Sequence, residues 1–544
     1  MRKRTPGANR NDPRDRAAMK NFSLPSVARI GGCLALLATF SACGLFGDAD
    51  NSGENSPADK TTADASPADH AANEQETYYV IYLAGAKVGY SRQVAHAGQD
   101  DQSIRTEQET HLKLRRYGQV ISNTMRVSQV NAADGGLLRL ESESQLGPTK
   151  KRTVGRIDGA TLVLEYPGQP NLSPVRQRWT EEDGGYFAVE RSLLAQPLRE
   201  GESRKVRQFS PILDHAYEVD LTGGPREEVE LLDGRYELQQ VAMQERIPLA
   251  PNGAAAAALQ TVVTTLWCDE QGTIVKTHSD TMQQETYLCD RTVALAEFDP
   301  RQIDLGTSTV VPLDRPLQDM AGSHRAVYAI DWQGDDAASL FVAQDRQQIE
   351  AGANGAIQLT VLHTTDAPAP DSADRPTAAD SSPSPLVESD APAIAELAAG
   401  IAPDETDPAQ LAHELARAVD RYMTKKDFSQ VFASAAEACA SKQGDCTEHA
   451  VLLAALCRSR GLPARVAMGL VYIDSLGGFA YHMWTQVWIG DRWLGLDATR
   501  GGSEVTVGHL QLAHSSLQGA KAYGSFLPML KVLGKLRLRL LAED

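Results

Sequence analysis

The residues of this chain that could perform chemistry lie toward its C-terminus, where a cysteine stands at the predicted start of an apolar helix. In the stretch G-D-C-T-E-H-A-V-L-L-A-A-L-C, Asp445 is a suitable N-cap and Glu448 stands where a capping box requires it. This spacing places Cys446 at the first helical position, and Gly461 predicts the end of the helix. The positive end of a helix favours a thiolate over a thiol and lowers the thiol pKa. The pattern therefore indicates a nucleophilic cysteine.

A nucleophilic thiol needs an imidazole beside it, and the imidazole needs a group that orients it. The stretches Y-H-M-W-T-Q-V-W (481–488) and W-L-G-L-D (493–497) predict two strands joined by a tight turn. With a loop of two or four residues, His482, Trp484 and Asp497 share one face of this hairpin. His482 and Asp497 are then diagonal neighbours within hydrogen-bonding reach. A loop with an odd number of residues would turn Asp497 to the opposite face.

Four sequence blocks occur in the order G-D-C-T-E-H-A, R-G-L-P-A-R-V-A-M-G-L-V-Y, H-M-W-T-Q-V-W and R-W-L-G-L-D-A-T. Together they resemble the transglutaminase-like superfamily over roughly residues 393–515. The resemblance implies an α+β papain-like core in which Cys446 is the nucleophile, His482 is the general base and acid, and Asp497 orients His482. It implies neither a metal ion nor an organic cofactor.

The oxyanion of an acyl-transfer intermediate needs hydrogen-bond donors. The backbone N–H of Cys446, at the helix start, is the first candidate. The side chains of Gln443, Tyr481 and Trp484 are further candidates, because each lies close in sequence to Cys446 or His482.

The other cysteine, histidine, arginine and tryptophan side chains of this region are predicted to be structural or are assigned no role. A tryptophan is more often a core residue than a substrate platform, and this expectation extends to Trp484. A cysteine deep in an apolar helix is more often a small core residue than a nucleophile. The residues in question are Cys439, Cys457, His449, Arg465, Trp488, Trp493, His509 and His514.

The elements that must position the site begin with helices. Residues 393–399 and 408–423 carry apolar side chains near helical spacing, and a third segment runs from residue 428 toward 439. These segments fit the same unit as the four blocks. We therefore expect the transglutaminase-like domain to span residues 393–544.

A long β region precedes this domain, from residue 77 to about residue 365. Short runs with alternating apolar and polar residues, separated by Gly, Asp and Pro, predict antiparallel sheet. Residues 301–365 either close that sheet or form a second small β unit, with a boundary near residue 300. Cys268 and Cys289 could form a disulfide there. No catalytic constellation is evident in this region.

Two segments are predicted to lack a packed core. Residues 44–76 are acidic and rich in small polar residues, which predicts a disordered tether. Residues 366–392 are rich in proline and aspartate, which predicts an extended linker or a long surface loop. The expected organisation is thus a multidomain chain, with an antiparallel all-β region followed by an α+β papain-like domain.

Residues 1–43 are predicted to be a targeting segment. An apolar run, too short for a permanent membrane span, ends at F-S-A-C, which resembles a bacterial lipoprotein signal with Cys43 as the lipidated residue. The alternative is an ordinary secretory signal cleaved near Ala42, and the start codon is either Met1 or Met19. The prediction is a lipid anchor at Cys43 in the bacterial cell envelope, in the periplasm or at the outer membrane.

These observations predict an enzyme that forms an acyl-enzyme at Cys446 from a peptide or carboxamide of a protein or peptide substrate. Resolution of the thioester by water makes a protease or amidase, which is modestly favoured, and resolution by an amine makes a cross-linking transglutaminase. A non-enzymatic envelope binding protein that uses its β region is the other alternative. Among the 544 residues the net charge is -18, which argues against nucleic acid as a partner.

Overall fold

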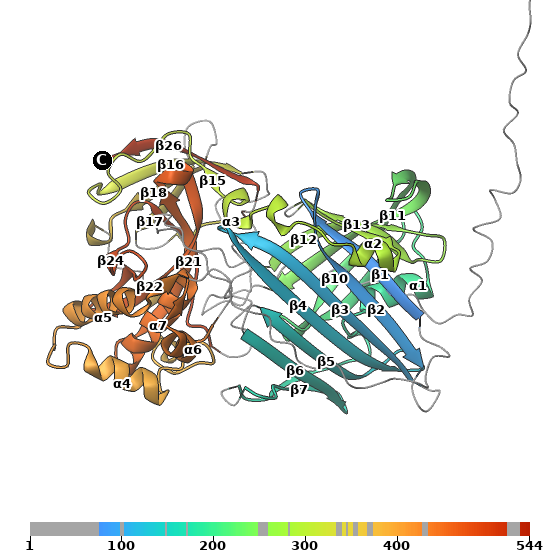
Figure 1. Ribbon diagram of the computed structural model, residues 1–544, viewed down its shortest axis with the longest axis horizontal. Helices are drawn as coiled ribbons and strands as arrows, with labels where there is room; N and C mark the ends of the chain where they lie inside the picture. The colour runs from blue at the N-terminus through green and yellow to red at the C-terminus, as the bar shows by residue number, and fades with distance from the viewer. Residues whose placement is uncertain are drawn as a thin grey trace, which may run out of the picture.

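The computed structural model describes most of the chain beyond residue 74. The described ranges are 75–97, 103–146, 149–169, 172–248, 259–280, 283–332, 340–343, 346–351, 357–366, 374–426, 433–518, 532 and 534–544. Figure 1 shows two lobes side by side, a strand-rich N-terminal lobe and a C-terminal lobe that holds most of the helices. The predicted signal with Cys43 and residues 44–74 of the predicted tether lie outside the described residues.

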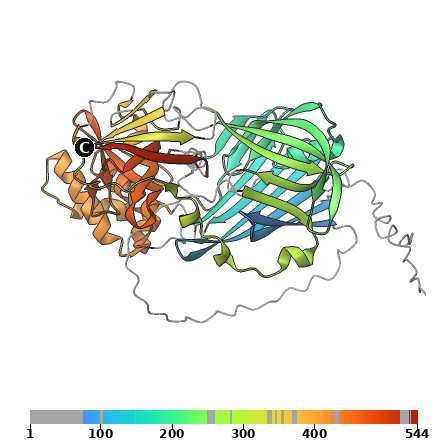
Figure 2. The same ribbon diagram turned by 90° about the horizontal axis from the view of Figure 1, so that it is seen from above.

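The N-terminal lobe is one antiparallel sheet of fourteen strands that curls on itself (Figure 2). Its order is β8-β7-β6-β5-β4-β3-β2-β1-β14-β13-β12-β11-β10-β9, so the first and last strands of the lobe pair at its centre. A short helix, α1 (Ala188–Ala195), follows β8. The strands are β1 Gln75–Leu83, β2 Ala86–Ala97, β3 Ser103–Arg116, β4 Gln119–Ala132, β5 Leu137–Leu146, β6 Thr149–Asp158, β7 Thr161–Glu165, β8 Val175–Arg178, β9 Ser203–Ser210, β10 His215–Glu230, β11 Arg235–Pro248, β12 Leu259–Cys268, β13 Ile274–Ser279 and β14 Gln284–Cys289.

Alternation along the strands determines which side chains face inward. From residue 106 onward, every second residue of β3 is buried, and β4 runs antiparallel beside it in register. The buried positions of β3 begin with Thr106, Gln108 and Thr110 and end with apolar residues and Arg116. The predicted antiparallel β region is confirmed. Cys268 and Cys289 are both free cysteines in the structure, so the disulfide considered between them does not form.

The chain leaves the long sheet after β14 through two short helices, α2 (Arg291–Leu295) and α3 (Leu305–Ser308). The next strand, β15 (Val311–Pro312), already pairs with a strand of the C-terminal lobe. Residues beyond it do not close the long sheet. They form a separate four-stranded sheet of order β17-β18-β16-β26, from β16 (Arg325–Trp332), β17 (Gln347–Ala351), β18 (Ile357–Leu362) and β26 (Leu536–Glu543). Residues 325–362 thus belong to a separate sheet, which β26 from the end of the chain completes.

The C-terminal lobe packs four helices against an antiparallel sheet. Helix α7 is buried along its length and packs on β21 and β22, and α4, α5 and α6 pack around it, with α5 also contacting β22, β23 and β24. The main sheet has the order β24-β23-β22-β21-β25, and two very short strands form a separate parallel pair. The elements are α4 Pro392–Gly400, α5 Pro408–Tyr422, β19 Lys425–Lys426, α6 Ala435–Ser441, β20 Gln443–Gly444, α7 Cys446–Ser459, β21 Ala464–Ile473, β22 Gly478–Ile489, β23 Arg492–Asp497, β24 Ser503–Glu504 and β25 His509–Ser515.

These elements agree with the expected helices at 393–399 and 408–423, which are α4 and α5. Each of these two helices has a proline in its first turn, where the absent N–H leaves no helical bond unmade. Strands predominate over helices in the whole chain, so the expected fold class holds in its coarse form, a large antiparallel β region followed by a lobe of helices and sheet. None of the helices in the described residues is long and apolar enough to span a membrane.

The predicted linker of residues 366–392 is packed into the C-terminal lobe over its described part. Both carboxylate oxygens of Asp374 bind the guanidinium of Arg465, at 2.6 and 2.9 Å, and the side chains of this pair are buried. The carbonyl of Asp374 accepts a hydrogen bond from the indole N–H of Trp493 at 2.7 Å. Leu386 and Val387 enter the core. The prediction of an extended linker or surface loop was wrong for this segment, because composition does not reveal that one acid has a buried partner.

Candidate active site

The first turn of α7 has the capping box that the sequence predicts. Asp445 Oδ1 accepts the N–H of Thr447 at 2.8 Å, and Glu448 Oε2 accepts the N–H of Asp445 at 2.9 Å. Gly444 precedes the cap at φ 149°, where a Cβ atom would lie 2.5 Å from Cβ of Glu448. The cap therefore fixes Cys446 as the first residue of α7, with its backbone N–H among the free donors of the helix start.

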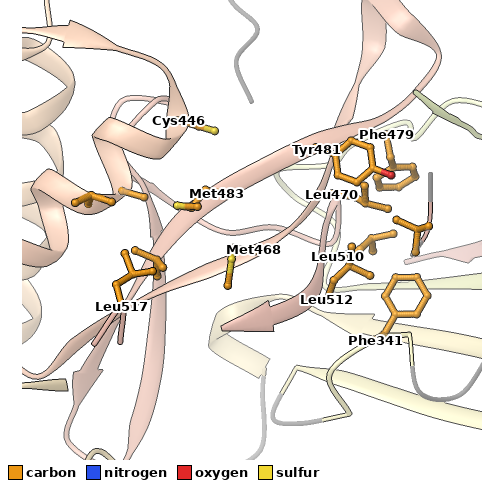
Figure 3. Packing of buried hydrophobic residues seen from close by; sticks show 14 of the residues in the cluster. Phe341, Cys446, Met468, Leu470, Phe479, Tyr481, Met483, Leu510, Leu512 and Leu517 are labelled. Atoms are coloured by element: carbon orange, nitrogen blue, oxygen red, sulfur yellow. The ribbon is translucent and has the colours of Figure 1, made fainter. Parts of the chain in front are cut away.

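Helix α7 rests on β22, the strand that carries the predicted imidazole. The hydroxyl of Thr485 donates to the carbonyl of Ala450 at 2.9 Å and joins the two elements. Cys446 is fully buried and belongs to the same hydrophobic cluster as Tyr481 and Met483 (Figure 3).

The hairpin of β22 and β23 has the register that the sequence predicts. Trp488 pairs with Trp493 across a two-residue turn, which leaves Asp497 on the same face as His482. His482 Nε2 and Asp497 Oδ2 are 2.7 Å apart, and the predicted hydrogen bond between them is present. Both side chains are buried, with exposed fractions of 5% and 0%.

Asp497 receives donors on both of its oxygens. The backbone N–H and the hydroxyl of Thr499 donate to Oδ1 at 2.9 and 2.7 Å, and His482 and His509 approach Oδ2 through Nε2 at 2.7 and 3.3 Å. Burial by itself raises the pKa of the Asp497 carboxyl, but the charge of His482 and the hydrogen bonds from His482 and His509 hold the pKa well below its usual range. The carboxylate therefore stays ionised and can orient an imidazole.

His509, to which sequence analysis gave no role, is the second imidazole on this carboxylate. The backbone N–H of Thr506 donates to His509 Nδ1 at 3.1 Å, so Nε2 carries the proton that points to Asp497. Burial lowers the pKa of His509 to about 4, and the ring is neutral at neutral pH. No local signal in the sequence could have identified it, because β25 meets the site only through the pairing of β21 with both β22 and β25.

A His509→Asn variant should retain the His482–Asp497 bond and lose the second donor on Oδ2. We expect roughly a tenfold loss of acyl-transfer rate, since one charge-assisted hydrogen bond stabilises by about 1.5 kcal/mol. The rate of Cys446 alkylation as a function of pH measures the effect. His324→Asn, at an exposed position just before β16, is the control. A wild-type profile in His509→Asn would mean that His509 only fills space.

His482, Asp497 and His509 could in principle hold a metal ion, because their ligand atoms lie within 4.8 Å of one another. The hydrogen bonds oppose this. A metal would need the lone pair of His509 Nε2, whereas the N–H of Thr506 fixes the proton on that atom. The donors fit a carboxylate shared by two imidazoles better than a metal centre.

The three predicted oxyanion candidates lie in different surroundings. Gln443 lies at the protein surface with its amide oxygen 3.2 Å from Lys425 Nζ. Trp484 lies in a separate cluster with Ala467 and Val505, and its ring stacks on His482 at 6.2 Å between centroids. Tyr481 is the candidate that shares the cluster of Cys446. Burial raises the pKa of Tyr481, so its hydroxyl remains a donor.

The residues predicted to be structural have structural surroundings. Arg465 pairs with Asp374 and stacks on Trp493 at 3.9 Å, and a ring nitrogen of His449 lies 2.6 Å from the carbonyl of Asp445. Cys457 is a free cysteine whose thiol pKa is raised to about 12 by burial. Cys457 lies within α7, away from the free N–H groups of the helix start that Cys446 occupies, so nothing offsets the effect of burial on its thiol.

His514 gives the C-terminal lobe a predictable dependence on pH. Burial lowers the pKa of His514 to about 4, below its ordinary 6.5, so the folded lobe binds this proton less readily than the unfolded chain does. The stabilising contribution is present above pH 6.5 and is lost as pH falls toward 4. In His514→Gln, the loss of unfolding free energy between pH 7 and 4.5 should be smaller by roughly 2 kcal/mol, measured by urea titrations. Equal losses in both proteins would contradict a buried neutral His514.

A family model of the transglutaminase-like superfamily matches residues 395–498, the segment that contains Cys446, His482 and Asp497. Residues 395–498 form a transglutaminase-like domain. The expected resemblance is confirmed, and the match begins two residues after the predicted domain start. The match excludes the long sheet of the N-terminal lobe. No curated protein matches the chain.

Several solved structures are similar to parts of the chain. A candidate cysteine protease from Cytophaga hutchinsonii is 15% identical, with 36% of this chain and 77% of that chain covered and a TM-score of 0.24. The periplasmic domain of TgpA from Pseudomonas aeruginosa, bound to ethylmercury, is 13% identical, with coverages of 34% and 93% and a TM-score of 0.23. A β-barrel-like protein of unknown function from Brucella abortus is 10% identical, with coverages of 39% and 96% and a TM-score of 0.29.

Proposed function

We propose that the transglutaminase-like domain is a thiol acyl hydrolase or transferase that acts on a peptide or carboxamide bond through Cys446. The observation that carries the proposal is the hydrogen bond between His482 and Asp497, on the strands against which the start of α7 rests. Burying the Asp497 carboxylate costs free energy, and Thr499 and two imidazoles must supply hydrogen bonds to offset that cost. A domain without catalytic activity would gain no stability from such an arrangement.

The tautomer of His482 decides its part in the reaction. Because Nε2–H donates to Asp497, Nδ1 is the ring atom available to accept the thiol proton. The Cys446 thiolate then attacks the carbonyl carbon, and the negative oxygen is stabilised by the backbone N–H of Cys446. Nδ1–H protonates the leaving amine as the tetrahedral intermediate collapses to a thioester. Water or an amine, deprotonated by Nδ1, attacks the thioester and releases Cys446.

The edge of β22 away from β21 is unpaired beside His482 among the described strands. β15 pairs with residues 478 and 479, and β23 pairs with residues 485 to 489, on the edge away from β21. Among the described strands, residues 480–484 pair with β21 alone. The mechanism requires Cys446 Sγ and His482 Nδ1 to meet beside this opening in the sheet.

Hydrolysis is favoured over amine transfer, because many bacterial members of the transglutaminase-like superfamily are thought to be proteases. The triad itself serves both outcomes, and the choice depends on whether the site admits a lysine-like amine and excludes water. Neither outcome requires a metal ion or an organic cofactor.

The envelope location also belongs to the proposal. Lipidation at Cys43 would hold the enzyme at a bacterial membrane, where protein or peptide substrates of the envelope are accessible. Incorporation of a labelled fatty acid into the wild-type chain, and its loss in Cys43→Ala, would support the anchor. Release of the wild-type chain as a soluble protein cleaved near Ala42 would contradict it.

The reactivity of Cys446 tests the enzymatic proposal directly. The full chain is reduced, freed of reductant and treated with iodoacetamide between pH 5 and 9, and the label on Cys446 is quantified by mass spectrometry. We expect a rate that stays high below pH 7 and that loses this behaviour in His482→Ala, as for a thiolate–imidazolium pair. Cys457, free and buried in the same helix, is the internal control. Labelling of Cys446 only above about pH 8 would contradict the proposal.

Assays of the two reactions then separate hydrolysis from transfer. Cleavage of a peptide mixture and incorporation of a labelled primary amine into casein are measured on the wild type and on Cys446→Ser. Cleavage without incorporation assigns a hydrolase, and incorporation assigns a transglutaminase.

A second candidate function, ligand binding by the N-terminal lobe, has an observation of its own. Gln93, Gln108 and Asn123 lie on neighbouring strands, are 3–4% exposed and each have a buried polar atom with no hydrogen-bond partner. Buried polar atoms are nearly always paired with protein or water, so this wall suits a polar ligand. Binding of peptidoglycan fragments by wild type, and its loss in Gln108→Leu, would favour this function. If wild type and Gln108→Leu bind peptidoglycan fragments equally, or if neither binds them, this second function is contradicted.

A further inference from the structure

The turn between β3 and β4 reaches from the long sheet to the start of α7. Tyr117 and Gly118 form the turn with φ of 44° and 83°, the conformation that suits the twist of a two-residue hairpin. Arg116, the last residue of β3, occupies one of the buried inward positions. In Figure 1, β3 and β4 run toward α3 and the C-terminal lobe. The hairpin therefore delivers a buried arginine to the junction of the two lobes.

Asp304, the N-cap of α3, holds this turn in one conformation. Its two oxygens accept the backbone N–H groups of Tyr117 and Gly118, each at 2.8 Å, and Arg115 Nε lies 3.2 Å away. Gly306 lies under the ring of Tyr117, where a Cβ atom would approach a ring carbon to 2.5 Å. The turn is thus fixed by the N-terminal lobe before it meets α7.

The guanidinium of Arg116 binds Asp445 Oδ2 at 2.5 Å, and the two side chains are 4% and 1% exposed. Asp445 uses its other oxygen to cap α7 through the N–H of Thr447. One carboxylate therefore joins the hairpin of the first lobe to the helix start of the second, immediately before Cys446. Removing one partner of a buried ion pair leaves an uncompensated charge, which costs far more than a surface pair does.

An uncompensated negative charge on Asp445 would shift the pKa values of the other titratable groups around this helix start. Burial raises the pKa of Glu448 well above its ordinary value, and the charge of Asp445 raises it further. Burial raises the pKa of Tyr117 to about 12. The titratable groups around the helix start and the hairpin turn are Asp445, Glu448, His449, Arg116, Tyr117 and Tyr481. Arg116 brings the permanent positive charge of this set.

We propose that Arg116 is a positioning residue through which the N-terminal lobe completes the active site of the transglutaminase-like domain. By holding and neutralising Asp445, it keeps the first turn of α7 in place and keeps a bare negative charge away from the Cys446 sulfur. The inference rests on the proposed function of Cys446 as a nucleophile. It gives the long sheet a task in catalysis, because the lobe that carries no catalytic group supplies the cation that the nucleophile helix needs.

Four variants of the full chain test the inference beside the wild type. They are Arg116→Met, Arg116→Lys, the double variant Arg116→Met with Asp445→Asn, and Arg126→Met. Arg126 lies on the same hairpin, is 62% exposed and pairs with Glu109 at 2.7 Å, so it is the matched control. Each reduced protein is alkylated with iodoacetamide between pH 5 and 9, the label on Cys446 is quantified, and the melting temperature is recorded.

Arg116→Met should react about tenfold more slowly at pH 6, with the profile displaced by about one pH unit toward alkaline pH. Arg116→Lys should keep most of the reactivity, and the double variant should recover it, because asparagine still caps a helix but carries no charge. Arg126→Met should behave as the wild type. A displaced pH profile in an Arg116→Met protein that is still fully folded at the assay temperature, as its melting curve shows, is a result that a merely structural role of Arg116 does not produce.

Each contrary result has a distinct meaning. A wild type that is unreactive below pH 8 contradicts the proposed function, and the inference falls with it. If the wild type is reactive below pH 8 and Arg116→Met has the same alkylation profile, the inference about Arg116 is overturned but the proposed function of Cys446 stands. The same conclusion follows if the double variant reacts as slowly as Arg116→Met. If Arg116→Met does not fold, the lysine and double variants give the same comparison, and a double variant with a displaced profile overturns the inference.

Discussion

An Asp497→Asn variant is expected to remain folded and to lose roughly two to four orders of magnitude in acyl-transfer rate, as equivalent changes do in a serine–histidine–aspartate triad. Asp497 accepts hydrogen bonds on both oxygens, from the backbone N–H and the hydroxyl of Thr499 on Oδ1 and from the Nε2–H groups of His482 and His509 on Oδ2. The side-chain amide of the variant would carry an NH₂ group in place of one of the two oxygens. In either orientation this NH₂ group, itself a donor, would face another hydrogen-bond donor. If the NH₂ group replaces Oδ2, His482 must accept through Nε2 and carry its proton on Nδ1, and it can no longer deprotonate Cys446.

The measurement is the pH profile of Cys446 alkylation together with the turnover of the best peptide or amine substrate. Asp491→Asn is the matched control, because Asp491 lies in the turn of the same hairpin with 67% of its side chain exposed. The melting temperature shows whether the variant is folded. A rate within threefold of the wild type would remove Asp497 from the mechanism.

Arg465→Met is expected to destabilise the C-terminal lobe by about 3–5 kcal/mol, the cost of leaving one partner of a buried ion pair alone. The guanidinium of Arg465 binds both oxygens of Asp374, donates to Gln486 at 2.8 Å and stacks on Trp493. Its removal leaves the Asp374 carboxylate buried and detaches the segment of residues 374–392 from the sheet. Arg465→Met with Asp374→Asn should recover part of the loss, because no charge is then left uncompensated.

Chemical denaturation followed by tryptophan fluorescence measures this effect, since Trp484, Trp488 and Trp493 all lie in the C-terminal lobe. Arg421→Met, at an exposed position near the end of α5, is the control and should change the unfolding free energy by less than about 0.5 kcal/mol. A loss of under 1 kcal/mol in Arg465→Met would mean that the segment is only loosely attached.

Local patterns in the sequence predicted the parts of the site that depend on local geometry. The capping box needs residues only three positions apart, so the helix start at Cys446 could be predicted from four letters. The hairpin needs a two-residue turn and period-two alternation, so the His482–Asp497 bond could be predicted without knowing the rest of the fold. The order of the four sequence blocks was sufficient to recognise the transglutaminase-like domain.

Composition predicted poorly where a single pair decides the outcome. Residues 366–392 have the proline and acid content of a linker, but one aspartate has a buried arginine 91 residues away in the chain. Cys268 and Cys289 have a plausible oxidising context, yet both are free cysteines on different strands. Neither result could be obtained from residue frequencies, because both depend on which side chains the fold brings together.

The sequence by itself determined that this chain carries a cysteine at a capped helix start, a histidine and an aspartate on one hairpin face, and a long antiparallel region with no chemistry of its own. Only the tertiary structure placed His509 on Asp497 and Arg116 on Asp445, across 12 and 329 residues of chain. The physical reason is the distance along the chain between the interacting residues. Caps and hairpins follow from backbone geometry over a few residues, whereas a shared carboxylate depends on strand order and on how two lobes dock, which no local spacing encodes.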